Sequence, residues 1–131
     1  MGYYSTMDEC NFVSNISAEE ITKKWHEKLK ENKDNYEDEG FEFRENGEKD
    51  GRYQIEVVPW NEEYYGKFYE DEEIAKFIST VIAQGDYTIL SFTGEDGAKW
   101  GYFIRLGKIR NIEYVAMVDG VKIDDTPRNT L

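Results

Sequence analysis

The sequence predicts an α+β domain in which an antiparallel sheet carries two helices on one face, in the order β-α-β-β-α-β-β-β. Two segments, 17–31 and 70–84, repeat apolar residues every three or four positions, as amphipathic helices do. Most of the remaining chain alternates apolar and polar residues, which is typical of strands with one solvated face. The 131 residues fit a single domain, 1–131, with a frayed tail expected over about 126–131.

The first helix has a clear start signal. Ser17 and Glu20 form a capping box, in which each residue satisfies a free backbone N–H of the first turn. A narrow apolar stripe follows at intervals of four residues and predicts a helix docked on the sheet, which ends near Glu31. The stripe consists of Ile21, Trp25 and Leu29.

The second helix has the stronger pattern. Residues 70–73 are all acidic, which favours a helix N-terminus because the helix dipole is positive there. Gly85 is the expected stop signal. The apolar face between them is broad and comprises Ile74, Phe77, Ile78, Val81 and Ile82.

Strands are expected in two groups. Residues 7–13 form the first strand, with Cys10 and Phe12 on one face. Residues 41–58 form a hairpin around a turn at 46–51, and Pro59 ends its second strand. The residues at 60–69 are expected to be irregular. After the second helix, strands are expected at 87–93, 100–106 and 111–118, with a turn at 94–97. The pair Asp119-Gly120 predicts a final tight hairpin into Val121 and Ile123.

The negative charge is concentrated in one part of the chain. The net charge is −12, and the window 34–73 alone holds 15 acids against four bases. Aromatic residues are interleaved with these acids. Two interpretations remain open: a solvated face that keeps the protein soluble, or an acidic surface that docks onto a basic partner. The second interpretation predicts contacts by the acids Glu37, Asp38, Glu39, Glu42, Glu45, Glu62 and Glu63, with Tyr64 and Tyr65 as aromatic anchors.

Common catalytic and cofactor motifs are absent from the sequence. Cys10 is the one cysteine, and we expect it to be a half-buried strand residue. His26 is the one histidine, and we expect it to be a partly exposed helical residue. There is no phosphate loop, dinucleotide fingerprint, calcium loop or nucleophile motif, so no cofactor, metal or catalytic residue is predicted. The acidic balance argues against direct nucleic-acid binding. No apolar run is long enough to span a membrane, and the expected location is the cytoplasm.

Two short segments carry a family resemblance. The opening Met-Gly-Tyr-Tyr-Ser-Thr at 1–6 resembles a family of short phage and bacterial proteins that begin Met-Gly-Tyr. The run Gly-Glu-Asp-Gly-Ala-Lys-Trp-Gly-Tyr at 94–102, followed by Gly107-Lys108, is similar to the C-terminal hairpin of that family. The resemblance implies a phage or prophage setting, where small acidic proteins often inhibit host defence as nucleic-acid mimics or anti-CRISPR proteins. It carries no active site.

Two functional hypotheses follow from different classes. The first is an acidic binding protein, an inhibitor that occupies the cationic groove of a host nucleic-acid-binding protein in the host cytoplasm. The second is a small hydrolase or ligand-binding domain whose site is assembled only by the tertiary structure. A structural or accessory phage protein is the third alternative. The one-sided charge of 34–73 favours the first.

Overall fold

The computed structural model describes residues 5–31, 41–59, 65–66, 71–115, 117–119 and 121–122. The two helices are α1 (Ala18–Glu31) and α2 (Asp71–Val81). The strands before α2 are β1 (Ser5–Met7), β2 (Cys10–Ser14), β3 (Phe41–Lys49), β4 (Arg52–Pro59) and β5 (Tyr65–Gly66). Those after it are β6 (Tyr87–Gly94), β7 (Lys99–Arg105), β8 (Lys108–Asn111), β9 (Met117–Val118) and β10 (Val121–Lys122).

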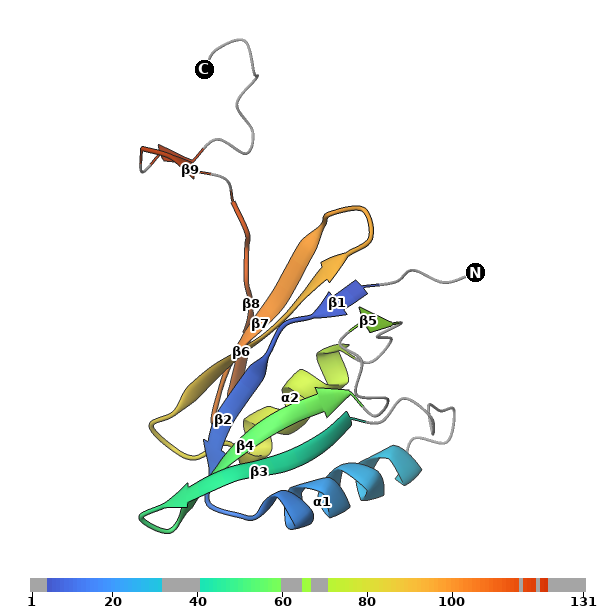
Figure 1. Cartoon of the computed structure of the whole chain (residues 1–131), viewed down its shortest axis with the longest axis vertical. Coiled ribbons are helices and arrows are strands. Elements are labelled where there is room, and N and C mark those ends of the chain that lie inside the picture. The colour runs from blue at the N-terminus through green and yellow to red at the C-terminus, as the bar shows by residue number, and fades with distance from the viewer. Residues whose placement is uncertain are drawn as a thin grey trace.

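The strands form three antiparallel sheets (Figure 1). A five-stranded sheet has the order β5-β1-β6-β7-β8, a three-stranded sheet has the order β2-β4-β3, and β9 and β10 form a separate hairpin. The α+β class and the order of helices and longer strands are as the sequence predicts. The sequence did not predict the division of the strands between two main sheets.

The two main sheets are joined where the N-terminal strand bends. The alternation over 7–13 predicts one strand, but the chain leaves the strand conformation at Asp8 and Glu9, between β1 and β2. Asp8 N donates to Ser91 O (2.9 Å), and Ser91 Oγ donates to the Asp8 carboxylate (2.7 Å). β1 therefore pairs with β6, whereas β2 pairs with β4, and the same stretch of chain belongs to both sheets.

Both helices pack into one core that the two sheets share. α1 packs on β3, and α2 packs on β7 and β8. The rings of Trp25 on α1 and Phe77 on α2 are 5.1 Å apart, and Phe77 is 5.6 Å from Phe43 on β3. Cys10 and Phe12 are buried on the same face of β2, as the alternation predicts. The hydrophobic effect of this one cluster thus holds helices and sheets together.

The Ser17 half of the capping box of α1 is confirmed. Ser17 Oγ accepts a hydrogen bond from Glu20 N (3.3 Å), and Ser17 O accepts the first helical bond from Ile21 N. Helix α1 ends at Glu31, as expected. Helix α2 begins at Asp71 and ends at Val81, and Gly85 after it adopts φ 92°, a conformation that favours glycine.

Two turns differ from the sequence-based expectation. The β3–β4 hairpin turns at Asp50-Gly51 alone, with φ values of 55° and 77°, so the expected turn at 46–51 is too long. A bulge between Glu45 and Gly47 absorbs the extra residue within β3. The expected strand 111–118 is also wrong, because β8 ends at Asn111 and β9 begins at Met117.

The remaining expectations have mixed outcomes. Val118 pairs with Val121, and Asp119 has φ 50°, as expected for the final tight hairpin. Of the region 60–69, only the short strand β5 is described. The expected frayed tail at 126–131 lies outside the described residues.

Candidate functional site

The structure places only some of the predicted contact residues. Glu42 and Glu45 lie on β3, and Tyr65 lies on β5, where its backbone pairs with Thr6. The other predicted contacts lie outside the described residues, and their role stays a prediction. These are Glu37, Asp38, Glu39, Glu62, Glu63 and Tyr64.

Glu42 and Glu56 lie on the outer face of the three-stranded sheet, and Glu9, just before β2, accepts from Asn11, which pairs with Glu56. We call Glu9, Glu42 and Glu56 the acidic face. The strand register pairs Glu42 with Val58 and Arg44 with Glu56, so these side chains point away from the core residue Val57. Each carboxylate has a weak polar neighbour. Arg44 lies 3.4 Å from Glu42, while Asn11 and Asn46 donate to Glu9 (3.3 Å) and Glu56 (3.4 Å).

The acidic segments of the sequence attach next to this face. Phe41 begins β3 and Pro59 ends β4, and the register pairs these two residues directly. The segment 34–39, with four acids, precedes Phe41 by one residue, and Glu62 and Glu63 follow Pro59 within four residues. Both segments therefore connect to the sheet at one end of the molecule, beside Glu42.

Of the predicted contact acids that the structure describes, Glu45 has a clear intramolecular role. Its carboxylate accepts a hydrogen bond from Ala18 N (3.2 Å), the first residue of α1. The sequence gives no sign of this contact, because the two residues are 27 positions apart. Glu45 thus supplements the capping by Ser17, and a carboxylate is favourable there because it faces the positive end of the helix dipole.

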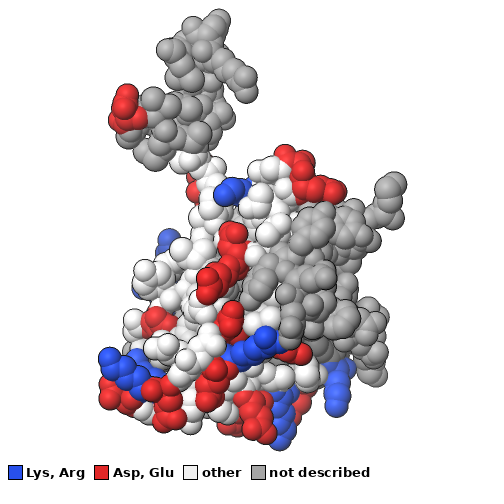
Figure 2. Space-filling view, viewed as in Figure 1, with Lys and Arg blue, Asp and Glu red and all other residues white. Residues whose placement is uncertain are grey.

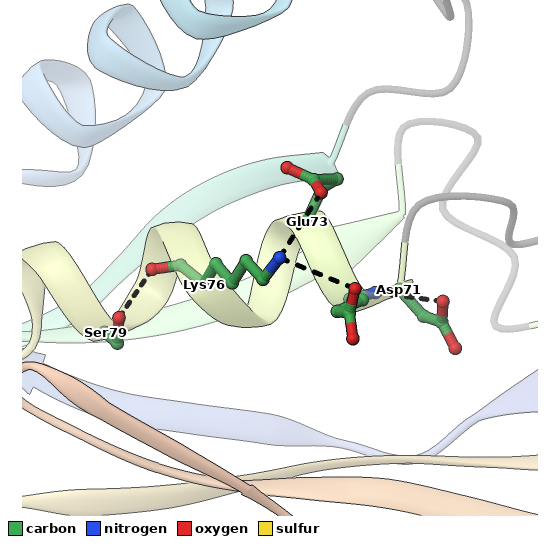
Figure 3. Close-up of polar contacts among 5 residues, drawn as sticks. Asp71, Glu73, Lys76 and Ser79 are labelled. Carbon is green, nitrogen blue, oxygen red and sulfur yellow. Dashed lines mark hydrogen bonds and ion pairs between the residues drawn. The ribbon is translucent and has the colours of Figure 1, made fainter.

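The acids that begin α2 are also used within the fold (Figure 3). Asp71 Oδ1 accepts from Glu72 N (2.9 Å), and its other oxygen accepts from the indole N–H of Trp100 on β7 (2.6 Å). Lys76 Nζ lies 3.5 Å from Glu72 and 3.9 Å from Glu73. Asp71 therefore links the start of α2 to the five-stranded sheet.

The charge pattern of the surface is uneven. Figure 2 shows acidic side chains recurring over the viewed face, whereas Lys and Arg lie mostly in its lower half. The tip of the β3–β4 hairpin contributes bases, because Lys49 and Arg52 pair across it. The excess of acid in 34–73 is therefore not spread over the whole three-stranded sheet, and the acidic face lies away from the hairpin tip.

The outer face of the five-stranded sheet has the opposite character. Strands β6, β7 and β8 contain no Asp or Glu. Their registers place four bases on the outer side, together with exposed or half-buried apolar side chains, and we call this surface the basic face. Its bases are Lys99, Arg105, Lys108 and Arg110, and its apolar residues are Tyr87, Ile89 and Phe103, with Tyr114 beside them.

Two aromatic rings on the basic face form a stacked pair. Tyr87 and Phe103 lie with their centroids 5.3 Å apart and an angle of 21° between the planes. Tyr87 is 60% exposed. Two acids next to this face are bonded within the fold: Asp8 accepts from Ser91 Oγ (2.7 Å), and Asp86 accepts from Val13 N (2.7 Å).

The lone cysteine and histidine show no catalytic arrangement. Burial raises the pKa of the Cys10 thiol to about 11, although the hydrogen bond with Thr88 opposes this shift. The thiolate, which is the nucleophile, is thus disfavoured at neutral pH. His26 is exposed on α1. Across the described ranges, no three His, Cys, Asp or Glu side chains are grouped so that they could hold a metal ion.

Sequence reasoning missed the basic face. The window 76–131 holds seven acids and seven bases, so its neutral sum hid the local excess of bases. A usable signal was present, because the 100–106 segment alternates core residues with Gly101, Phe103 and Arg105. Reading the residues between the core positions as a second face would have found the bases and the exposed rings.

Comparisons with known proteins add no family. The chain matches no protein-family model, and neither its sequence nor its structure matches a curated protein or a solved structure. In the part of the chain that the structure describes, neither helix has the length and apolar character needed to cross a membrane.

Proposed function

We propose that the protein is a binding protein without catalytic activity, which docks through its acidic face onto a basic surface of a protein partner. One observation carries this proposal. The register pairs Phe41 with Pro59, and the sequence places the acids of 34–39 just before the first and Glu62 and Glu63 just after the second, which supports a concentration of negative charge beside Glu42. Concentrated charge of one sign steers an oppositely charged partner into encounter.

The predicted contact acids divide by role in this proposal. Glu42 is exposed over 47% of its side chain and pairs with the exposed neighbour Arg44, and a basic partner can replace that pairing at little cost. Glu45 is engaged at the start of α1 and contributes its charge from there. Glu37, Asp38, Glu39, Glu62 and Glu63 are proposed contacts from the sequence alone.

The partner is a protein that binds nucleic acid, and the carboxylates stand in for phosphates. A nucleic-acid-binding groove presents clustered Lys and Arg, which is the surface that a dense row of carboxylates complements. The resemblance of residues 1–6 and of the run 94–102 with Gly107-Lys108 to small phage proteins supports a partner among host defence proteins. This class of inhibitor needs no catalytic group, metal or cofactor of its own.

Salt and competition test the proposal. The tagged protein is used to capture partners from bacterial lysate, and the purified partner is then titrated at about 50 and 500 mM salt. We expect binding to weaken at least tenfold, because exposed charges are screened beyond about 8 Å at physiological salt. Duplex DNA or RNA is expected to displace the protein. A partner that is indifferent to both salt and nucleic acid would show the acidic face to be a solubility feature.

A further inference from the structure

A cavity lies at one end of the basic face. Its volume is about 450 Å³, within the range of about 300–1,000 Å³ that is typical of small-molecule sites. It is formed where the turn after α2 meets the β7–β8 turn. The side chains that matter for its chemistry are Asp86, Tyr87, Phe103, Arg105, Leu106 and Lys108.

The cavity is held in shape by backbone contacts. Gly107 N donates to Ser79 O near the end of α2 (2.9 Å), and Asp86 N donates to Ala83 O (3.1 Å). Gly85 and Gly107 both line the cavity in left-handed conformations, with φ values of 92° and 74°. A Cβ added at either glycine would meet no atom within 4 Å, so the backbone there is open to a ligand.

The lining joins two kinds of recognition. The stacked rings of Tyr87 and Phe103 form an apolar wall, and the exposed ring of Tyr87 can stack on a planar group. Arg105 and Lys108 are paired across β7 and β8, and both are exposed beside that wall. A guanidinium and an ammonium group so placed complement an anion. The Asp86 carboxylate is held at the rim by a hydrogen bond from Val13 N and can accept a further hydrogen bond from a ligand hydroxyl group.

We propose that this cavity binds a small molecule in which a planar aromatic ring is linked through a hydroxylated group to an anion, as in a nucleoside monophosphate. The charge complementarity is local, because β6, β7 and β8 carry four bases and no acid in a protein of net charge −12. The site is separate from the acidic face, and its failure leaves the proposed function untouched.

Two other occupants fit the same observations less well. A second copy docked through the same face would bring its own four bases against these four, and like charges across an interface oppose association. A single-stranded nucleic acid would bring many phosphates towards a chain of net charge −12, whereas a monophosphate brings one anionic group. The observations therefore favour a small ligand.

The test is an amide NMR titration of the whole protein with adenosine monophosphate, and with adenosine and inorganic phosphate in separate arms. We expect the monophosphate to shift the signals of Gly85 and Gly107 saturably, and adenosine and phosphate to bind at least tenfold more weakly. Tyr87→Ala and Arg105→Ala should each weaken binding about tenfold, since each removes one half of the recognition.

Matched controls lie on the same face. Tyr114→Ala and Lys99→Ala remove an exposed ring and a base outside the cavity, and each should leave the affinity within twofold. Thermal unfolding checks that all variants fold. The proposal is overturned if the monophosphate gives no saturable shift up to about 10 mM, because a dissociation constant above that concentration is too high for a specific site of this size. It is also overturned if the control variants weaken binding as much as the cavity variants, which would indicate a polyanion spread along the whole face.

Discussion

Replacing Asp71 by alanine tests how the fold is fastened around α2. Asp71 makes two hydrogen bonds at once, accepting from Glu72 N at the helix start and from the indole N–H of Trp100 on β7. Trp100 also stacks on Phe92 at 5.5 Å, so the bond reaches a ring that packs against the core. The substitution therefore removes a helix cap and a contact between α2 and the five-stranded sheet together.

The expected loss is the sum of two contributions. Loss of an N-terminal cap costs about 1 kcal/mol. A hydrogen bond to a charged acceptor contributes about 1.5–3 kcal/mol, and the lower end applies because both side chains are only half-buried. We expect a decrease in the free energy of unfolding of about 2.5 kcal/mol. For a domain of this size the melting temperature should fall by roughly 6–10 °C.

The same substitution has a second, independent readout. Burial, the largest cause, and the negative charges of Asp71 and Glu72 together raise the pKa of Tyr102 to about 12, because burial and nearby negative charge both oppose formation of the phenolate. Without Asp71 the pKa should fall, yet stay above the ordinary value of 10.0, since burial remains. Site-specific NMR of the Tyr102 ring through an alkaline titration measures the shift.

Glu72→Ala is the matched control for stability. Glu72 is in the same helical turn, but its side chain forms the exposed ion pair with Lys76. Such pairs contribute about 0–1 kcal/mol, so this variant should unfold within about 0.5 kcal/mol of the parent. Denaturant unfolding followed by Trp fluorescence compares the two. If Asp71→Ala is no less stable than Glu72→Ala and the Tyr102 pKa does not move, the link between α2 and β7 is not as described.

Three further predictions concern the core and its pH dependence. Gly101→Ala should destabilise the protein by about 1–3 kcal/mol, measured by denaturant unfolding, because a Cβ would lie 2.8 Å from the Leu90 carbonyl oxygen and 3.0 Å from the Tyr114 hydroxyl; an unchanged midpoint would contradict this. Stability should fall between about pH 9 and 12, because the pKa values of Cys10 and Tyr102 are raised in the folded protein and the unfolded chain therefore loses these protons first as the pH rises. In a pH series of unfolding curves, Cys10→Ala should remove the lower part of this fall. The Cys10 thiol should react with a disulfide reagent at pH 8 only as fast as the protein opens, so a native rate equal to that in denaturant would refute its burial.

Local signals predicted much of the fold. Ser17 and Glu20 fixed the start of α1, and the acids at 71–73 with the apolar residues behind them fixed α2. The Asp119-Gly120 pair predicted the final hairpin. These features depend on contacts within a few residues, which is why the sequence reveals them.

Features that depend on distant partners were not predictable. The alternation of apolar and polar residues over 7–13 gives no sign of the bend at Asp8. The bend is stabilised by Ser91, which is 83 positions away in the sequence. The expected strand 111–118 does not form as one element because Ile112 N bonds to Gly101 O and the chain then leaves β7. An apolar-polar pattern fixes which face a residue takes, but not which strand it pairs with.

The candidate sites show the same division. The excess of acid was visible in the sequence, but the helix cap by Glu45 was not, because its partner is on another element. The basic face was hidden for a different reason. Its bases are spread over three strands that become neighbours only through the register of β6, β7 and β8.

The most direct test of the proposed function is the association rate of charge-reversal variants with the captured partner, measured by surface plasmon resonance at low salt. The triple variant Glu9→Lys, Glu42→Lys, Glu56→Lys reverses the acidic face. The control Glu19→Lys, Glu48→Lys, Glu95→Lys makes the same change in net charge at exposed acids elsewhere. We predict that the first variant slows association at least tenfold and the control much less, because local charge steers the encounter. Equal rates for the two variants would contradict docking through the acidic face.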